Sequence, residues 1–474
     1  MKTEELGWRT ERDSLGERRV PDGAMWGAHT SRSLENFPFE GERLPVEIVR
    51  GMAELKRAAA RANAKLGVLD GRKAEAIAEI CGEIEEGKWD GEFRVARFQA
   101  GSGTSSHMNL NEVIANAANV RLGGKAGEKK PVHPNDDVNR GQSTNDIFPS
   151  GGKVALVRAL PQLLGALEGL GASLRRQGER WAGMRKPGRT HLQDAVPTTL
   201  GLELRAWAWA VEKDVRRLER AREGLLELSA GGNAIGTGIN APKGFREALV
   251  EEMNAEEARR GGERWWRMPG DGMGAVQFLT DFAEYSGALR CAALDVQKIA
   301  NDLRLLASGP RTGLGEVRLP AVEAGSSIMP GKVNPSICEA VAMASMEVQG
   351  LDHAVSLAVG AGQLELNTHM PLVTSDCLRA TGLLATAAEI LATKCMDGLE
   401  GVGEVCARHL EESAALPTLL NPVLGYDRVA ALVKESVATG KTLRTLALEK
   451  GLLTEGEYEA LVAGAFENVR SGSV

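Results

Sequence analysis

The sequence has few aromatic residues and no closely spaced pair of cysteines. Phe, Trp and Tyr make up 4% of the 474 residues, which disfavours a strand-rich fold because strands are enriched in aromatic and β-branched side chains. The six cysteines include no Cys-x-x-Cys pair, and the seven histidines are equally dispersed. This pattern argues against a zinc site, an iron–sulfur cluster and a disulfide framework. We therefore expect no metal and no cofactor.

Excess positive charge and long apolar runs are missing as well. The formal net charge is -7 and the pI is about 5.7, so the chain has no general attraction for nucleic acid or anionic membranes. The first residues lack an apolar signal core, and no stretch approaches the roughly 18 uninterrupted apolar residues of a membrane span. We expect a cytoplasmic protein that binds neither nucleic acid nor membrane.

Apolar residues in the middle of the chain recur at spacings of three and four, the period of a helix buried along one face. Several long helices in succession predict an all-α fold built on a helical bundle. One stripe covers 200–228, and the other two are formed by Val157, Leu160, Leu164, Leu167 and Leu174, and by Leu289, Ala292, Val296, Ile299, Leu303 and Leu306.

Two changes in composition suggest domain boundaries. The stretch 123–134 is rich in Gly, Lys and Pro, and a second break lies near 397–405. We expect a mostly helical N-terminal domain over 1–145, a central domain of long helices over 146–397, and a small helical C-terminal domain over 398–474.

Four polar segments interrupt the helical pattern, and each is rich in neutral hydrogen-bond donors. Such donors suit a substrate carboxylate, because hydrogen bonds to a charged group are about twice as strong as neutral ones. Taken singly, each segment also has a structural explanation, since Ser, Thr and Asn commonly cap helices and form turns. The segments are 101–109, 133–146, 188–194 and 325–335.

The last polar segment reads Gly-Ser-Ser-Ile-Met-Pro-Gly-Lys-Val-Asn-Pro. It combines two hydroxyls, a cation and a carboxamide, which together suit a small dianion. Gly325 and Gly331 allow backbone angles that other residues avoid, and Pro330 and Pro335 prevent a continuous helix. We expect a mobile loop that closes over its substrate.

This segment resembles the signature of the fumarase/aspartase superfamily, whose members add or remove a group across the double bond of fumarate. The other polar segments match further blocks of that superfamily in the same order. The resemblance extends from 13–16, 26–30 and 33–37 to 425–427, and the opening blocks look like the fumarase/aspartase branch. The resemblance implies a homotetramer with a shared helical bundle, in which loops of three subunits build each site for a small dicarboxylate.

The resemblance also implies roles for individual residues. Ser326 is the expected base that takes a proton from carbon, with its pKa lowered by nearby Lys332 and by loop N–H groups. His191 and Glu339 are the other expected catalytic residues, with Glu339 pairing with the histidine. The implied substrate-binding residues are Ser102, Thr104, Ser143, Thr144, Asn145, Thr190, Lys332 and Asn334, and His133, Asn135 and Asp136 match a secondary anion site.

One residue departs from the family pattern. The family usually has Asn where this chain has His107. The histidine either changes hydrogen bonding in the pocket, and with it pH dependence or substrate choice, or only packs there.

The leaving group has to be predicted from flanking residues, because water and ammonia leave from nearly the same geometry. Leu305, Thr312, 362–367 and 451–454 resemble aspartase, whereas 338–340 and 102–104 resemble fumarase. The main expectation is aspartate ammonia-lyase acting through an aci-carboxylate intermediate, and the alternative is class II fumarate hydratase. A catalytically silent structural homologue is a remote third possibility, which the complete set of motif residues disfavours.

Overall fold

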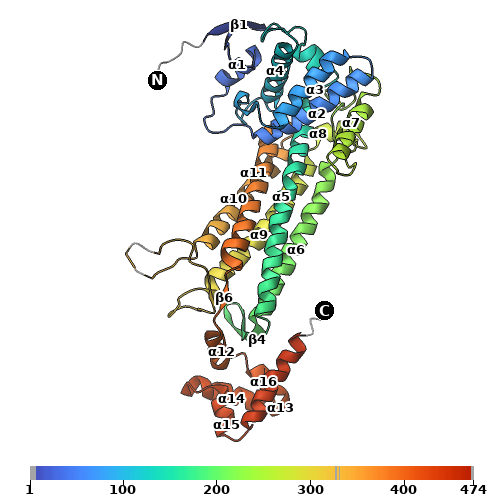
Figure 1. Cartoon of the computed structure of the whole chain (residues 1–474). Helices are drawn as coiled ribbons and strands as arrows, with labels where there is room; N and C mark the ends of the chain where they lie inside the picture. Colours follow the sequence, from blue (N-terminus) through green and yellow to red (C-terminus); the bar gives the residue numbers. More distant parts are fainter. Residues whose placement is uncertain (1–6, 326–327, 330, 471–474) are drawn as a thin grey trace. The chain divides into compact units, whose positions relative to one another are not determined.

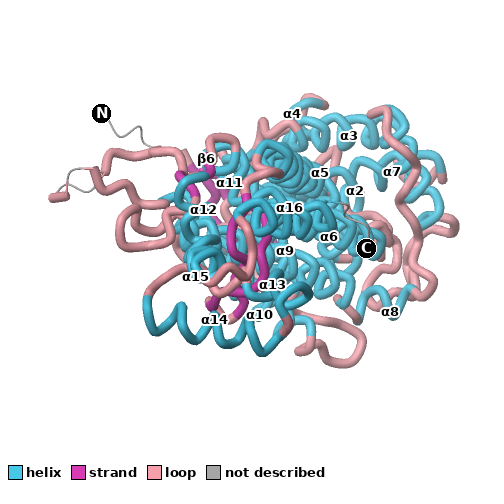
Figure 2. The backbone as a smooth tube through the Cα atoms, turned by 90° about the horizontal axis from the view of Figure 1, so that it is seen from below, coloured by secondary structure: helices cyan, strands magenta, loops and turns pink. Residues whose placement is uncertain are grey.

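The computed structural model describes residues 7–325, 328–329 and 331–470. Helices make up most of this part of the chain, as Figure 2 shows, which confirms the all-α prediction. The strands in the described residues form three separate two-stranded antiparallel sheets. These pair β1 (Trp8–Asp13) with β2 (Gly16–Pro21), β3 (Arg185–Thr190) with β4 (Gln193–Thr199), and β5 (Val317–Arg318) with β6 (Glu400–Gly401).

The chain divides into two compact units, each made of three stretches of sequence. The first unit holds the described residues up to Leu164, together with Arg216–Cys291 and Glu347–Leu384, and the second holds Gly165–Val215, Ala292–Met346 and the described residues from Ala385 onward. The division into domains 1–145, 146–397 and 398–474 stays a prediction. Five long helices begin in one unit and end in the other, namely α5 (Thr144–Arg180), α6 (Leu200–Leu225), α9 (Thr280–Leu306), α10 (Ser336–Val359) and α11 (Met370–Leu391).

Helix α2 (Val46–Lys65) lies at the centre of the packing in the first unit. It packs against α3 (Gly71–Glu85), α4 (Thr104–Arg121) and α7 (Phe245–Arg259), as can be followed in Figure 1. It also approaches the start of α5 closely, because a Cβ on Gly51 would overlap the backbone oxygen of Gly151. The further helices of this unit are α1 (Ala28–Asn36), η1 (Asp90–Glu92), η2 (Pro134–Val138) and α8 (Gly272–Gln277).

The second unit ends in a group of short helices with an apolar core of its own. Leu416, Leu420, Leu446 and Tyr458 are among its buried side chains. Their removal from water stabilises this group of helices. The helices of this group are α12 (Gly403–Glu412), α13 (Pro417–Leu424), α14 (Tyr426–Thr439), α15 (Leu443–Glu449) and α16 (Glu455–Arg470), whereas η3 (Ala392–Met396) directly follows α11.

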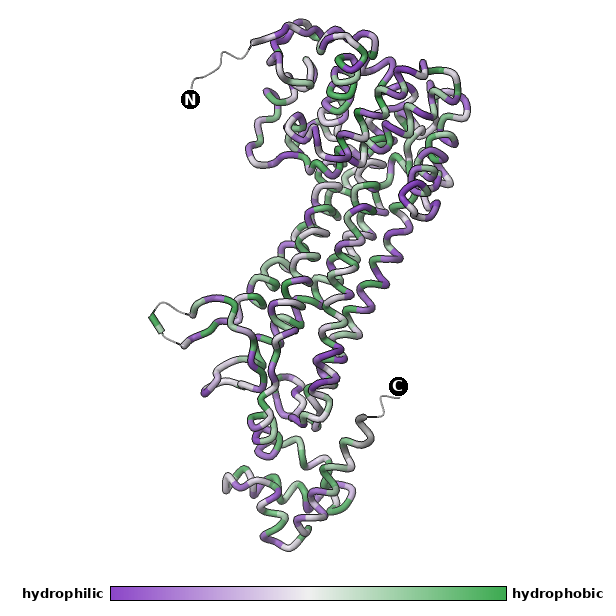
Figure 3. The backbone as a smooth tube through the Cα atoms, in the orientation of Figure 1, coloured by the Kyte–Doolittle hydropathy of each residue, from purple (hydrophilic) through white to green (hydrophobic). Residues whose placement is uncertain are grey.

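The apolar stripes predicted from the sequence lie on α5, α6 and α9. Every residue of the predicted α9 stripe is buried. On α5, Leu163 is buried, whereas the predicted stripe residue Leu164 is only partly buried. The sequence pattern does not distinguish these two leucines, because steps of three and of four residues from Leu160 both keep to the helical period. Figure 3 shows hydrophobic and hydrophilic residues alternating along these helices.

Helix α5 is long and apolar enough to cross a membrane if length and composition alone are considered. Half of its most apolar window is buried inside the protein. Core helices of water-soluble proteins have the same properties, so this helix is weak evidence for a membrane span.

Candidate functional site

The donor segments 101–109 and 143–146 meet in the first unit, where the first turns of α4 and α5 come together. Gly103 precedes α4 with a φ of +87°, and a Cβ there would overlap the ring of Phe148 on α5. Only glycine therefore allows this approach. His107 Nδ1 consequently lies 2.8 Å from Thr144 Oγ1. The hydroxyls of Ser102, in the turn before α4, and of Thr104, the first residue of α4, are 2.9 Å apart.

A buried carboxylate holds the 143–145 segment in place. Asp146 is fully buried and accepts N–H groups from Ser143 at 2.9 Å, Gly231 at 2.9 Å and Asn233 at 2.7 Å. Burial raises the pKa of Asp146 to about 7, and these N–H groups act in the opposite direction. The Asn145 side chain adds a bond to the Ala234 carbonyl. The segment is thus tied to the turn at 231–234.

Asp146 was not among the predicted site residues, although its position carries a signal. It stands three residues after Ser143, and in a capping box the third residue of the first turn accepts the N–H of the capping residue. The Ser143 N–H bond to Asp146 has this pattern. The sequence therefore contained the information that Asp146 organises the start of α5.

A buried lysine supports the same region from α2. Lys56 is fully buried, and its Nζ donates to Asn139 Oδ1 and Gln142 Oε1, both at 3.0 Å. Burial lowers the pKa of Lys56 to about 7, against the influence of Cys81 and Asp146. No sequence signal pointed to Lys56, since it lies in an alanine-rich helix 83 residues before its first partner.

The three residues of the predicted secondary anion site lie together at the start of η2. His133 Nδ1 accepts the N–H groups of Asn135 at 3.2 Å and Asp136 at 3.1 Å, so the imidazole caps this short helix. The Asp136 carboxylate lies 3.3 Å from the same nitrogen. Asn135 and Asp136 are exposed. A role for these residues in anion binding stays a prediction.

In the second unit, Thr190 and His191 lie at the tip of the β3–β4 hairpin. His191 and Leu192 have φ values of +57° and +60°. Turns with positive φ at both central residues match the twist of the two strands that they connect. Thr190 and His191 are both exposed. The turn thus presents the two predicted site residues outward from the hairpin.

The buried carboxylate of Glu316 binds two basic side chains of this hairpin. Its carboxylate is fully buried and lies 2.8 Å from Lys186 Nζ, 2.7 Å from an Arg189 guanidinium nitrogen and 2.9 Å from His409 Nδ1. Burial alone would raise the pKa of Glu316, but hydrogen bonds and charge from Arg189, Lys186 and His409 lower it to about 2. Sequence reasoning missed Glu316, because its partners come from distant parts of the chain.

The last of the four polar segments, 325–335, is called the signature loop below, and the structure describes both of its ends. Lys332 and Asn334 are exposed, and Lys332 Nζ donates to Asn334 Oδ1 at 2.9 Å. A Cβ on Gly325 would overlap the carbonyl of Lys332, so glycine is needed where the two arms of the loop meet. Ser326, the expected base, lies outside the described residues, as do Ser327 and Pro330.

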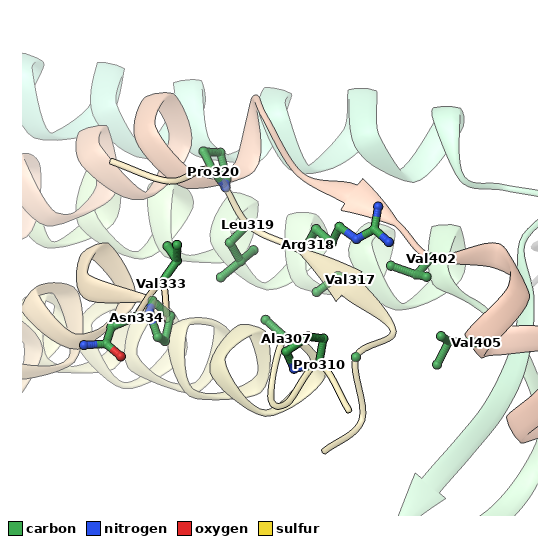
Figure 4. A pocket seen from close by; sticks show the side chains of 12 residues that line it. Ala307, Pro310, Val317, Arg318, Leu319, Pro320, Val333, Asn334, Val402 and Val405 are labelled. Atoms are coloured by element: carbon green, nitrogen blue, oxygen red, sulfur yellow. The ribbon is translucent and has the colours of Figure 1, made fainter. Parts of the chain in front are cut away.

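A cavity of about 320 Å³ lies at the foot of this loop. Most of its lining residues have apolar side chains, and Val333 and Asn334 lie at one end of it (Figure 4). The base of the loop is therefore not filled by side chains of the second unit. Other lining residues are Ala307, Pro310, Val317, Arg318, Leu319, Pro320, Val402 and Val405.

Glu339 lies in the first turn of α10, close to the end of the loop. Its carboxylate is 3.8 Å from the guanidinium of Arg304, so within one chain its ionic partner is an arginine rather than His191. The predicted Glu339–His191 pair stays a prediction, since sites built from three subunits would join residues of different copies.

The predicted site residues fall into both units. Ser102, Thr104, His133, Asn135, Asp136, Ser143, Thr144 and Asn145 belong to the first, and Thr190, His191, Lys332, Asn334 and Glu339 to the second. Across the described part of the chain, no three His, Cys, Asp or Glu side chains are grouped in a way that could hold a metal ion.

Comparison with known proteins shows the family. A family model described as Lyase matches residues 16–350, and a model of the fumarase C C-terminus matches residues 416–464. The chain belongs to the fumarase/aspartase superfamily of lyases. The resemblance recognised in the four polar segments is thereby confirmed.

Relatives and solved structures match over almost the whole chain. The class II fumarate hydratase 1 of Pseudomonas aeruginosa is 44% identical over 96% of this chain and 97% of its own length, and that of Thermus thermophilus is 44% identical over 96% and 97%. The crystal structure of class II fumarase from Schistosoma mansoni has a TM-score of 0.93 at 35% identity, covering 96% of this chain and 98% of its own. The cobalt-bound fumarate lyase:delta crystallin from Brucella melitensis has a TM-score of 0.93 at 43% identity, covering 99% and 100%.

The expectation that the chain is an aspartate ammonia-lyase is wrong. Many curated relatives that match over 96% of the chain at 42–44% identity are named class II fumarate hydratases. The flanking residues misled because several of them serve packing or lie on the surface. Asn367 is buried and donates to the carbonyls of Ala358 and Val359 at the end of α10, whereas Leu364 is 87% exposed. Leu453 belongs to the apolar core of the C-terminal helices.

Proposed function

We propose that this protein is a class II fumarate hydratase, which adds water to fumarate to give L-malate and catalyses the reverse reaction. The observation that carries the proposal is the 44% identity to class II fumarate hydratases over 96% of the chain. Similarity to the class II fumarase from Schistosoma mansoni, with a TM-score of 0.93, supports the same assignment.

The chemistry accounts for the many neutral donors in the polar segments. In the direction from malate to fumarate, a base removes a proton from the carbon next to a carboxylate, and that carboxylate becomes a dianionic aci-carboxylate. The hydroxyl group then takes a proton from a general acid and leaves as water, and the double bond of fumarate forms. Preorganised donors stabilise the charge where it develops, so they contribute to the rate as well as to binding.

We assign the two carboxylates of the substrate to different segments. Lys332 and Asn334 hold one carboxylate, with the lysine as a point charge and the amide as a directional donor. Thr104, Ser143, Thr144 and Asn145 hold the other carboxylate and the leaving group, and Thr190 and His191 complete the pocket. The bond between Ser143 and Asp146 supports this assignment, because a fixed donor loses little freedom when substrate binds.

The leaving group is tested with fumarate and two cuvettes, one with ammonium and one without. We expect the ultraviolet absorbance of fumarate to fall at the same rate in both cuvettes, with L-malate as the product. L-malate supplied alone should yield fumarate. Fumarate consumption that requires ammonium, with aspartate as the product, would contradict the proposal.

We further propose that the active enzyme is a tetramer in which three subunits build each site. Exposed apolar side chains on α10 support this, since Met343, Met346 and Leu357 are 65%, 55% and 64% exposed in the single chain. Apolar groups gathered on one helix are typical of a surface that another chain covers. Light scattering of the purified protein is expected to give four times the 50.5 kDa chain mass. A monomer with full activity would refute the assembly.

The cytoplasmic location stays a proposal.

A further inference from the structure

His107 occupies an unusual position next to the proposed substrate donors. It lies in the first turn of α4 and is 1% exposed. Its Nδ1 is 2.8 Å from Thr144 Oγ1, whereas its Nε2 is buried without a hydrogen-bond partner among the described residues. The imidazole therefore makes one polar contact in this part of the chain, and that contact is with a proposed substrate-binding hydroxyl.

The imidazole is neutral at ordinary pH. Burial lowers the pKa of His107 well below its usual value, and the neighbouring charges of Lys56 and His29 lower it further. A neutral imidazole carries its proton on only one nitrogen. The two tautomers have opposite consequences for Thr144.

The unpartnered nitrogen decides between the tautomers. A proton on Nε2 would leave a buried N–H donor unsatisfied, and orphaned N–H groups are rarer in proteins than under-used acceptors. A proton on Nδ1 leaves only an unused acceptor at Nε2 and satisfies the donor through Thr144. The tautomer with Nδ1–H is therefore the more stable one here.

The direction of this bond determines what Thr144 offers to a ligand. A threonine hydroxyl has one proton and two acceptor lone pairs. When Oγ1 accepts Nδ1–H, the hydroxyl proton is free to point elsewhere. Thr144 is half-buried in the first turn of α5, so the proton can reach the side where a ligand binds. An ionised carboxylate only accepts hydrogen bonds, so it is matched by this donor.

We propose that His107 is a positioning residue of the dicarboxylate site, which donates Nδ1–H to Thr144 and thereby directs the threonine hydroxyl proton toward a substrate carboxylate. This inference rests on the proposed function for the identity of the substrate. It also assigns a role to the residue at which the chain departs from its family. An asparagine side-chain amide at the same position can donate the same bond.

A double-mutant cycle tests whether His107 acts through the Thr144 hydroxyl. We expect His107→Leu and Thr144→Val each to raise the KM for fumarate and the inhibition constant of succinate about tenfold, as for the loss of one hydrogen bond to a charged group. In the double variant, the KM for fumarate and the inhibition constant of succinate should be no higher than in Thr144→Val alone, because the histidine then has no hydroxyl to orient. His107→Asn should remain within about twofold of the wild type for both constants.

A neighbouring polar residue provides the control for this cycle. Ser106 is buried in the same turn of α4, but its hydroxyl bonds to Gln99 rather than to Thr144. Ser106→Ala should leave both constants unchanged. Additive losses in the double variant, or a loss in His107→Asn equal to that in His107→Leu, would overturn the inference and show that the histidine only fills space.

Neutron diffraction reads the proton directly and does not depend on activity. We expect deuterium on Nδ1 of His107 and none on Nε2; deuterium on Nε2 would overturn the inference. A wild-type protein that fails to hydrate fumarate would instead overturn the proposed function. The two failures are therefore distinguishable.

Discussion

Replacing Ser326 with alanine should lower kcat for fumarate hydration about a thousandfold, within the range that a positioned base contributes. We expect this serine to remove the proton from carbon when malate reacts and to return it when fumarate is hydrated, and alanine has no group that can carry this proton. The thermal midpoint and the light-scattering mass should not change, since the methyl group of alanine requires no additional space. Steady-state kinetics in both directions provide the measurement.

The adjacent serine is the matched control for this experiment. Ser327→Ala removes a hydroxyl one residue further along the same sequence segment and should retain kcat within a few-fold of the wild-type value. If Ser327→Ala is the inactive variant, the base has been assigned to the wrong serine. If both variants keep substantial activity, neither hydroxyl is the base.

Replacing Glu316 with glutamine should destabilise the protein by about 3 kcal/mol, the order expected when one partner of a buried ion cluster loses its charge. Lys186 and Arg189 would then face a neutral amide, although both are largely buried. We expect a thermal midpoint lower by on the order of 5 °C at neutral pH. Because Arg189 precedes Thr190 and His191, KM for fumarate should rise as well.

The effect of Glu316→Gln should depend on pH. The pKa of Glu316 in the folded protein is lowered to about 2 from an ordinary value of 4.5, so its stabilisation is fully present above the ordinary pKa and is lost as pH falls through that interval. The difference between the midpoints of wild type and variant should therefore shrink from about pH 4.5 downward. A difference that is independent of pH would contradict the role of the charge.

Glu203 offers a control in the same cluster. It also bonds to Lys186, at 2.7 Å, but its side chain is 28% exposed, whereas that of Glu316 is fully buried. Solvent screening reduces the contribution of an exposed partner. Glu203→Gln should therefore lower the thermal midpoint much less than Glu316→Gln. Equal losses would mean that the buried position of Glu316 has no special importance.

The helical part of the fold was predictable because it depends on periodicity along the chain. On α9 every residue of the predicted stripe is buried, since the spacing of apolar residues fixes which face of a helix leaves water. The donor segments were also recognisable, because they interrupt that pattern with Ser, Thr, Asn and Gly. The leaving group was not predictable, since the residues used to choose it pack against other parts of the fold or lie on the surface.

The side-chain contacts that hold the donor segments in place were not predictable, because they join residues far apart in the sequence. Lys56 and Gln142, Asp146 and Asn233, and Glu316 and Arg189 are each separated by more than 80 residues. Nothing in the local sequence specifies which buried charge will meet which partner, because burial and hydrogen-bond geometry arise only when distant segments pack together. His107 illustrates this most directly, since its hydrogen bond with Thr144 depends on the close approach of α4 and α5 at Gly103.

The sequence by itself therefore determined the helical class, the superfamily and the segments that supply hydrogen-bond donors, because each of these is encoded by residue type and spacing. The tertiary structure alone decided which buried groups hold those donors and in which direction a hydroxyl such as that of Thr144 can point. The physical reason is that the charge state and hydrogen-bond direction of a buried group are set by its neighbours in space, which the order of residues along the chain does not reveal.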